Sequence, residues 1–149
     1  MKKFTIASIL ALAAISASAL EVGVTTTTDY SGDDHRQAFG ATVGQQYGKI
    51  NVTGGFQRFT SGVSQDRYSV VAGYDVAKVG VFTITPKVGA AYLNNAGGSD
   101  GYAMTVGAGV SVPVAKQVTV GIDFARQFGQ DRVKASDGNT VTAGVKYTF

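Results

Sequence analysis

The chain has 149 residues, no cysteine and a formal net charge of +3 at pH 7. Without cysteine it forms neither disulfides nor thiolate metal sites, and it has no clustered basic stripe of the kind that nucleic-acid-binding surfaces carry. We therefore expect no nucleic-acid partner and no cofactor. With 20 glycines and only 2 prolines, the composition favours a fold held together by backbone pairing.

Residues 1–19 have the features of a cleaved secretory signal peptide. Lys2 and Lys3 give a positive start, residues 4–15 are apolar, and Ala-Ser-Ala at 17–19 fits a small-residue cleavage site. The apolar stretch is shorter than the roughly 20 residues of a membrane-spanning helix. The sequence thus predicts export, with residues 20–149 forming one domain.

After residue 19, apolar and polar residues alternate in eight segments separated by turn-forming residues. A period of two predicts strands, and most segments approach the roughly 9–11 residues that a tilted membrane strand needs. The expected fold is all-β: an eight-stranded antiparallel up-and-down transmembrane β-barrel. The segments are 20–30, 37–47, 49–59, 67–76, 80–93, 102–114, 117–128 and 140–149.

The connections between these segments alternate in length. Long polar connections occupy 31–36, 60–66, 94–101 and 129–139, whereas short ones lie at Gly48, at 77–79 and at 115–116. This alternation is typical of outer-membrane barrels, which have short periplasmic turns and longer external loops.

The aromatic residues after residue 19 share the apolar face of their strands, except Phe59. They are predicted to form two belts, as at the two interfaces of a membrane. A soluble sandwich core, the alternative, would place aromatic residues in mid-strand as often as at strand ends. The belt beside the long connections contains Tyr30, Tyr68, Tyr92, Tyr102 and Phe128, and the belt beside the short turns contains Tyr47, Tyr74, Phe82, Tyr147 and Phe149.

The opposite face is small and polar, and eight strands enclose a space that side chains just fill. We therefore expect a filled lumen rather than an open pore. Because the first and last strands are neighbours in a closed barrel, Glu21 and Lys146 are expected to form an ion pair. The predicted lumen charge cluster is Glu21, Asp29, Asp75, Lys87, Asp123 and Lys146.

Two residues conflict with a regular barrel. Pro86 lies within segment 80–93, where its missing N–H predicts a bulge or a local strand break. Arg126 falls on the outward face, where it is tolerable only if its side chain reaches the interface.

The last segment ends with apolar or aromatic residues at alternate positions, Val145, Tyr147 and Phe149. With the export signal and the eight alternating strands, this pattern resembles small outer-membrane barrels of the OmpA transmembrane-domain, OmpX and Ail type. The resemblance implies a monomer in the outer membrane of a Gram-negative bacterium, in contact with lipid and lipopolysaccharide. It also implies that the C-terminal pattern is read by the barrel-assembly machinery, with periplasmic chaperones acting during biogenesis.

The long connections contain few candidates for chemistry. His35 is the only histidine and shares its loop with Ser31, so no rigid strand places a nucleophile beside it. The acidic residues match no calcium-loop spacing, and we expect no metal site and no catalytic residue. Basic residues in or beside these connections are predicted to pair with lipid phosphates: Arg36, Arg67, Arg132 and Lys134.

Three functions remain open at this point. A structural, envelope-integrity or surface-interaction barrel needs no catalytic residues and is the leading interpretation. The alternative is a narrow, porin-like channel for small solutes, whose conductance would depend on the charged residues of the lumen. The third is a lipid-modifying enzyme, for which His35 would be the candidate base.

Overall fold

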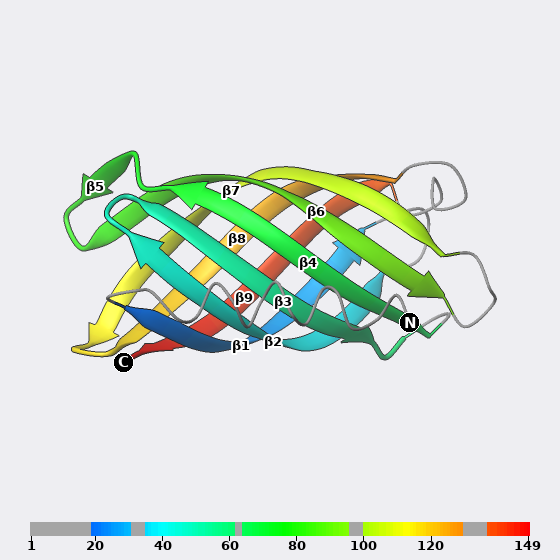
Figure 1. Cartoon of the computed structure of the whole chain (residues 1–149), viewed down its shortest axis with the longest axis horizontal. Coiled ribbons are helices and arrows are strands. Elements are labelled where there is room, and N and C mark those ends of the chain that lie inside the picture. The colour runs from blue at the N-terminus through cyan, green and yellow to red at the C-terminus, as the bar shows by residue number, and fades with distance from the viewer. Residues whose placement is uncertain (1–18, 31–34, 62–63, 96–99, 130–136) are drawn as a thin grey trace.

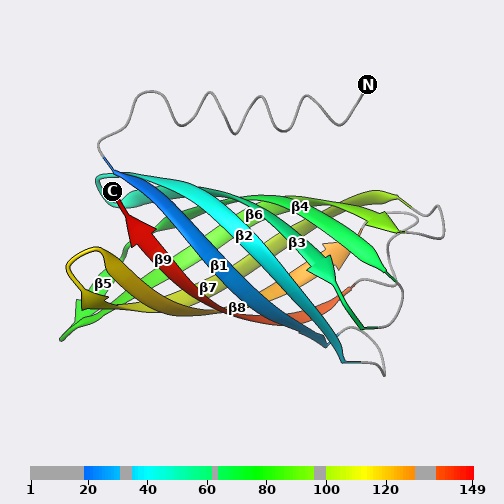
Figure 2. The same ribbon diagram turned by 90° about the horizontal axis from the view of Figure 1, so that it is seen from below.

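A computed structural model describes residues 19–30, 35–61, 64–95, 100–129 and 137–149, so the expected signal peptide lies outside the described residues except for Ala19. Strands curl into a closed cylinder with its ends to the left and right in Figures 1 and 2. Within the described residues, no helix has the length and apolar character to cross a membrane. The strands are β1 (Leu20–Tyr30), β2 (Arg36–Tyr47), β3 (Ile50–Phe59), β4 (Gln65–Tyr74), β5 (Ala77–Val79), β6 (Phe82–Asn95), β7 (Gly101–Ala115), β8 (Val118–Gly129) and β9 (Gly138–Thr148).

Eight of these strands form the barrel wall, and each pairs antiparallel with its neighbours in the chain. The first and last strands, β1 and β9, also pair, while β4 pairs with β6. The three-residue strand β5 pairs only with the start of β6. The predicted eight-stranded antiparallel barrel is therefore confirmed, with β5 as an added hairpin strand.

Short turns gather at one end of the barrel, called here the short-turn end, and the opposite end is called the loop end (Figure 1). Gly48 and Gly80 begin two of these turns, each with φ of 61°, which costs glycine little because it has no Cβ. The predicted turn at 77–79 is wrong in detail. These residues form β5 instead, because the chain reverses at Gly80 and Val81.

Both prolines lie beside irregularities of the sheet. Strand β6 runs unbroken through Pro86, which stays in register with Ala108 of β7. On its other edge, β6 pairs first with β5 and then with β4. Between these two pairings the partner chain contains one extra residue, so the register shifts by one. The irregularity expected at Pro86 thus falls in the neighbouring strand, where a missing N–H is tolerated. A second register shift, between β7 and β8, begins at Pro113.

The outer face of the barrel is apolar and the inner face is polar. Large apolar side chains such as Val24, Phe39 and Tyr102 are 58–64% exposed on the outside. The buried apolar residues are few and small apart from Phe59 and Leu93. The interior is thus not a conventional hydrophobic core.

Aromatic side chains form contacts across strands on the outer face. Phe56 packs against Tyr68 with ring centroids 5.1 Å apart, and Tyr92 packs against Tyr102 at 5.3 Å. Because Tyr68 is also directly opposite Tyr92, the four rings form one row near the loop end. At the short-turn end, Tyr147 and Phe149 contact each other at 4.9 Å.

Candidate functional site in the barrel interior

The candidate site is the lumen, where charged side chains gather at three levels along the barrel. The level nearest the loop end centres on Asp29 of β1, which is completely buried. Asp29 Oδ2 accepts hydrogen bonds from Arg36 Nη2 at 2.9 Å and from Arg67 Nη2 at 3.3 Å. Two arginines from different strands therefore share one buried carboxylate.

An aromatic ring completes this level. Phe59 is 2% exposed, and the guanidinium carbons of Arg36 and Arg67 each lie 4.9 Å from its ring centroid. Cations at this distance are attracted to the face of an aromatic ring, most strongly where water is excluded. The inward position of Phe59, the exception among the aromatic residues, thus has a structural role.

Amide and hydroxyl groups extend the network to other strands. Arg67 Nη1 donates to Gln57 Oε1 at 3.4 Å, and Gln57 Nε2 donates to Thr27 Oγ1 at 2.7 Å. Arg36 Nη1 donates to Gln65 Oε1 at 3.3 Å. We call this group the loop-end plug, and it consists of Thr27, Asp29, Arg36, Gln57, Phe59, Gln65 and Arg67.

The plug corrects one prediction from the sequence. The sequence predicts that Arg36 and Arg67, in or beside the long connections, pair with lipid phosphates, but both point into the barrel and pair with Asp29. Their position follows from the strand period, because both occupy the inward phase of a strand that begins earlier than predicted. The other two residues of that prediction, Arg132 and Lys134, lie outside the described residues.

The second level is an ion pair between Lys87 of β6 and Asp123 of β8, with Nζ 2.5 Å from Oδ1. These strands are not neighbours, because β7 lies between them. The side chains meet over Gly109 of β7, where a Cβ would overlap Asp123 Oδ1 and stand 3.1 Å from Lys87 Nζ. Glycine at this position therefore makes room for the ion pair.

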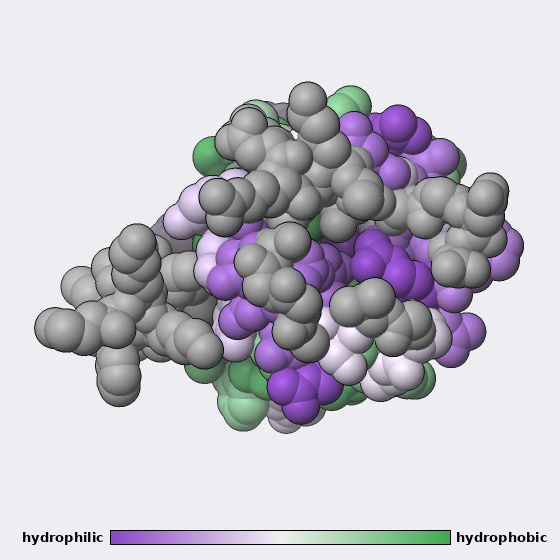
Figure 3. Space-filling model, turned by 90° about the vertical axis from the view of Figure 1, so that its right-hand side faces the viewer, coloured by the Kyte–Doolittle hydropathy of each residue, from purple (hydrophilic) through white to green (hydrophobic). Residues whose placement is uncertain are grey.

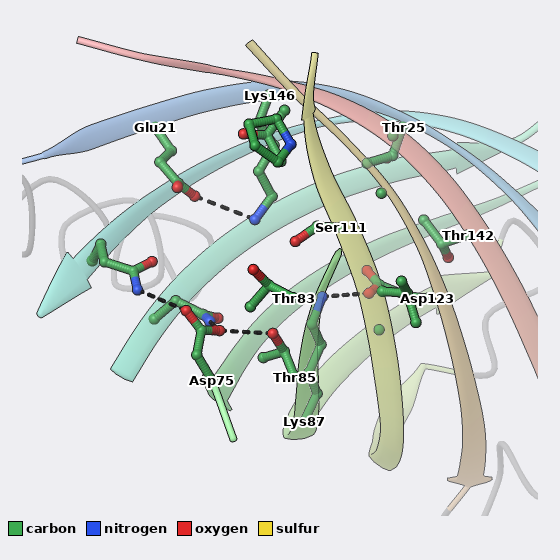
Figure 4. Close-up of a pocket in the computed structure, with 18 residues that line it drawn as sticks. Glu21, Thr25, Asp75, Thr83, Thr85, Lys87, Ser111, Asp123, Thr142 and Lys146 are labelled. Atoms are coloured by element: carbon green, nitrogen blue, oxygen red, sulfur yellow. Dashed lines mark hydrogen bonds and ion pairs between the residues drawn. The ribbon is translucent and has the colours of Figure 1, made fainter. Parts of the chain in front are cut away.

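The third level lies toward the short-turn end and contains the expected pair of Glu21 and Lys146, whose charged atoms are 3.2 Å apart (Figure 4). Asp75 lies nearby, and among the described residues no cation forms an ion pair with it. Its carboxylate accepts hydrogen bonds from Thr85 Oγ1 at 2.7 Å and from Gln46 Nε2 at 3.1 Å. All six residues of the predicted charge cluster thus line or close the lumen, joined by Arg36 and Arg67.

Two cavities lined by described residues lie in the lumen. One of about 240 Å³ extends toward the short-turn end, past Glu21 and Asp75. The other, of about 140 Å³, extends toward Arg67. Both are lined in part by Lys87 and Asp123, so this ion pair stands where they adjoin.

The lumen is filled differently at its two ends. At the loop end, Leu93 and Gln127 are fully buried, as are four members of the plug: Thr27, Asp29, Phe59 and Gln65. The view onto this end shows hydrophilic side chains in the middle and hydrophobic ones toward the lower rim (Figure 3). Both cavities lie on the short-turn side of the plug. The lumen is therefore narrow at the loop end and wider toward the short turns.

The remaining candidates lie at the loop end. His35 is exposed and its ring lies 5.0 Å from that of Tyr30, while Ser31 lies outside the described residues. Arg126 is placed outward, donates to Asn139 Oδ1 at 3.4 Å and lies over Phe128. In the part of the chain that the structure describes, no group of three His, Cys, Asp or Glu side chains could hold a metal ion.

Comparison by structure places the chain among small barrels. The N-terminal β-barrel domain of OprF from Pseudomonas aeruginosa matches with a TM-score of 0.74 and 15% identity, over 89% of this chain and 98% of that one. Neisserial surface protein A matches at 0.59 and 18% identity, over 88% and 96%. The Yersinia pestis outer membrane protein Ail, in a phospholipid nanodisc, matches at 0.55 and 14% identity, over 88% and 99%.

These similarities concern the fold. They confirm the predicted resemblance to eight-stranded barrels of this type. No protein-family model matches the chain, and no curated protein matches it by sequence. At such low identities, activity has to be argued from the chain's own residues.

Proposed function

We propose that this protein is an integral outer-membrane barrel of a Gram-negative bacterium, exported with cleavage of its signal peptide after Ala19. The observation that carries the proposal is the polarity of the two faces of the wall: the outer face is apolar and the inner face is polar, the reverse of a soluble protein. Large apolar residues such as Val24, Val106 and Ile122 are 53–64% exposed outside, whereas Asp29 is fully buried inside. Water would disfavour such an outer face, but lipid solvates it. Each of the eight described wall strands also pairs with a neighbour on both sides, as a lipid environment requires.

Within the membrane, the role supported best is structural: envelope integrity or surface contact by a monomeric barrel. The loop-end plug makes the outer part of the lumen a network of mutual hydrogen bonds and ion pairs, with no arrangement for turnover among the described residues. Outer-membrane lipid and lipopolysaccharide would contact the belts, and the barrel-assembly machinery would read Val145, Tyr147 and Phe149 after delivery by periplasmic chaperones.

Cell fractionation tests this proposal. The protein should be recovered in the outer-membrane fraction, migrate differently on gels with and without heating, and have a mature N-terminus at Leu20 by mass spectrometry. Recovery as a soluble periplasmic protein would contradict the proposal.

A second candidate function, a narrow channel for small solutes, is favoured by the two adjoining cavities. Against it stands the plug, which contains the buried Asp29 and Phe59. Recordings in planar bilayers distinguish the two functions. We expect no discrete conductance from the wild-type protein, and a stable single-channel step would favour the channel.

We do not propose an enzyme. If His35 is a solvated residue contacting Tyr30, the substitution His35→Ala should leave lipid A composition unchanged when measured by mass spectrometry of extracted lipid. A modification that is present with wild-type protein and absent with the variant would instead establish lipid-modifying activity.

A further inference from the structure

Each of the three short connections of the barrel contains one exposed lysine. Lys49 lies in the turn between β2 and β3, Lys78 lies in β5, and Lys116 lies in the turn between β7 and β8. None of the three has an ion-pair partner within the described residues. The nearby acidic side chains, Glu21 and Asp75, are directed into the lumen and engaged there. The rim at this end is therefore positively charged.

Exposed aromatic or apolar residues accompany each lysine. Tyr47 and Ile50, 46% and 48% exposed, flank the turn that contains Lys49. Val79 and Phe82, 62% and 49% exposed, are paired across the hairpin next to Lys78.

Lys116 has an equivalent setting. It precedes Gln117, whose Oε1 accepts a hydrogen bond from Tyr147 Oη at 2.9 Å. Tyr147 in turn contacts Phe149, which is 70% exposed. In such a setting the aromatic ring lies at the edge of the hydrocarbon, and the lysine ammonium group extends beyond the ring into the headgroup region. This arrangement suits the binding of a phospholipid headgroup.

The loop end differs in charge. Among its described cations, Arg58 is matched by Asp66 through two hydrogen bonds of 2.9 and 3.1 Å. Arg126 faces outward, where it lies over Phe128 and donates to Asn139, and Arg36 and Arg67 are directed inward. In sequence, the connections at this end are more acidic than basic: Asp33, Asp34, Asp100, Asp131 and Asp137 against Arg132 and Lys134. Among the described residues, the short-turn end thus has three exposed lysines without an ion-pair partner, against one such cation, Arg126, at the loop end.

We propose that Lys49, Lys78 and Lys116 form a lysine rim that binds the headgroups of anionic phospholipids in the leaflet at the short-turn end. The proposal rests on the membrane location proposed above. It places cationic lipid contacts at the end of the barrel opposite to the one that the sequence suggested.

The chain contains no tryptophan, so a single introduced tryptophan reports on its local lipid. In Tyr47→Trp protein refolded into vesicles of phosphatidylcholine and phosphatidylglycerol, brominated phosphatidylglycerol should quench fluorescence more strongly than brominated phosphatidylcholine. Adding Lys49→Gln should lower the relative association constant for the anionic lipid about fivefold, the factor corresponding to one lysine near an anionic surface. The matched variant Lys49→Arg keeps the charge and should keep the preference.

A reporter at the other end provides the spatial control. Quenching in Tyr102→Trp protein should not respond to Lys49→Gln, and high salt should abolish the lipid preference of the Tyr47→Trp reporter by screening. If Tyr47→Trp does not fold, the pair Phe82→Trp and Lys78→Gln tests the same inference.

Equal quenching by both lipids at the short-turn end, or a preference unchanged by Lys49→Gln, would overturn the lysine rim. Failure of the wild-type protein to fold into pure phosphatidylcholine vesicles would instead contradict the membrane proposal itself. Heat-dependent gel mobility, measured before any quenching, separates these two failures.

Discussion

The contrast between two aspartate–arginine pairs defines the electrostatics of single residues in this barrel. Asp29 is fully buried and shared by Arg36 and Arg67, whereas Arg58, paired with Asp66, is 66% exposed. Removing one partner of a buried pair leaves an uncompensated charge, while exposed pairs contribute little because water screens them.

We therefore predict that Asp29→Asn lowers the free energy of unfolding by about 3 kcal/mol. The control, Asp66→Asn, should lower it by no more than about 1 kcal/mol. Urea unfolding of the barrel in lipid vesicles measures both. Equal losses would show that the Asp29 carboxylate is hydrated rather than buried.

Two glycines of neighbouring strands provide a second comparison. A Cβ on Gly107 would overlap the Phe124 carbonyl oxygen and stand 2.7 Å from Ala125 Cα, whereas a Cβ on Gly121 would meet nothing closer than 3.4 Å. Overpacking costs about 1–3 kcal/mol.

Gly107→Ala should accordingly destabilise the barrel by about that amount, and Gly121→Ala should be close to neutral. Unfolding midpoints of the two variants in the same lipid give the difference. Equal unfolding midpoints for the two variants would contradict this prediction and show that the wall at Gly107 relaxes to accommodate the added Cβ.

At the scale of elements, the C-terminal strand β9 has a proposed second role in assembly. Phe149 is 70% exposed and contacts Tyr147 on the outer face, so its loss removes little interior packing. We predict that Phe149→Ala slows insertion into the outer membrane of cells while refolding into detergent proceeds at the wild-type rate.

Pulse-chase labelling with a heat-modifiability readout measures insertion in cells, and Phe82→Ala serves as a control of equal size change at the same end. If both variants assemble equally slowly, general loss of apolar surface rather than a C-terminal signal is responsible.

The wall elements were largely predictable because a period of two identifies both a strand and its faces. Predicted and observed strand ends differ by only a few residues. The Glu21–Lys146 ion pair was predictable because the first and last strands of a closed barrel are neighbours. The same alternation also places Arg67 on the inward phase, opposite in direction to Tyr68. The prediction of a lipid contact at Arg67 is wrong because Arg67 begins its predicted strand directly beside a long polar connection, and position along a strand alone does not show whether such a cation faces lipid or lumen.

Other features depend on distances between strands that a sequence does not encode locally. The contact of Lys87 with Asp123 crosses β7 and depends on the open space at Gly109. Strand β5 arises because positive φ at Gly80 moves the chain reversal beyond 77–79. The alternation of polar and apolar residues predicts neither the Lys87–Asp123 ion pair nor strand β5, because both depend on how the strands are aligned in three dimensions.

For the whole molecule, conduction should be controlled by the loop-end plug. Phe59 is 2% exposed and contacts the guanidinium groups of Arg36 and Arg67. The double substitution Phe59→Ala and Arg67→Ser removes the ring and one of the cations that close the lumen. We predict that it produces a measurable conductance in planar bilayers, whereas we expect none from the wild-type protein.

Phe56→Ala is the matched control, because Phe56 lies on the same strand and points outward. Conductance in the control as well would show that a loosened wall, rather than the removed plug, admits ions. If the double variant also shows no conductance, the barrier to ions lies elsewhere along the lumen.

The pairing of Glu21 with Thr148 joins residues near opposite ends of the chain. Until that seam closes, the growing sheet presents two bare edges, each able to recruit strands from another molecule. Every hairpin can form locally, yet the cylinder is complete only when its last strand arrives, so the largest loop-closure entropy falls on the final step. The time between the emergence of β1 and the docking of β9 is therefore when this protein is most exposed to aggregation.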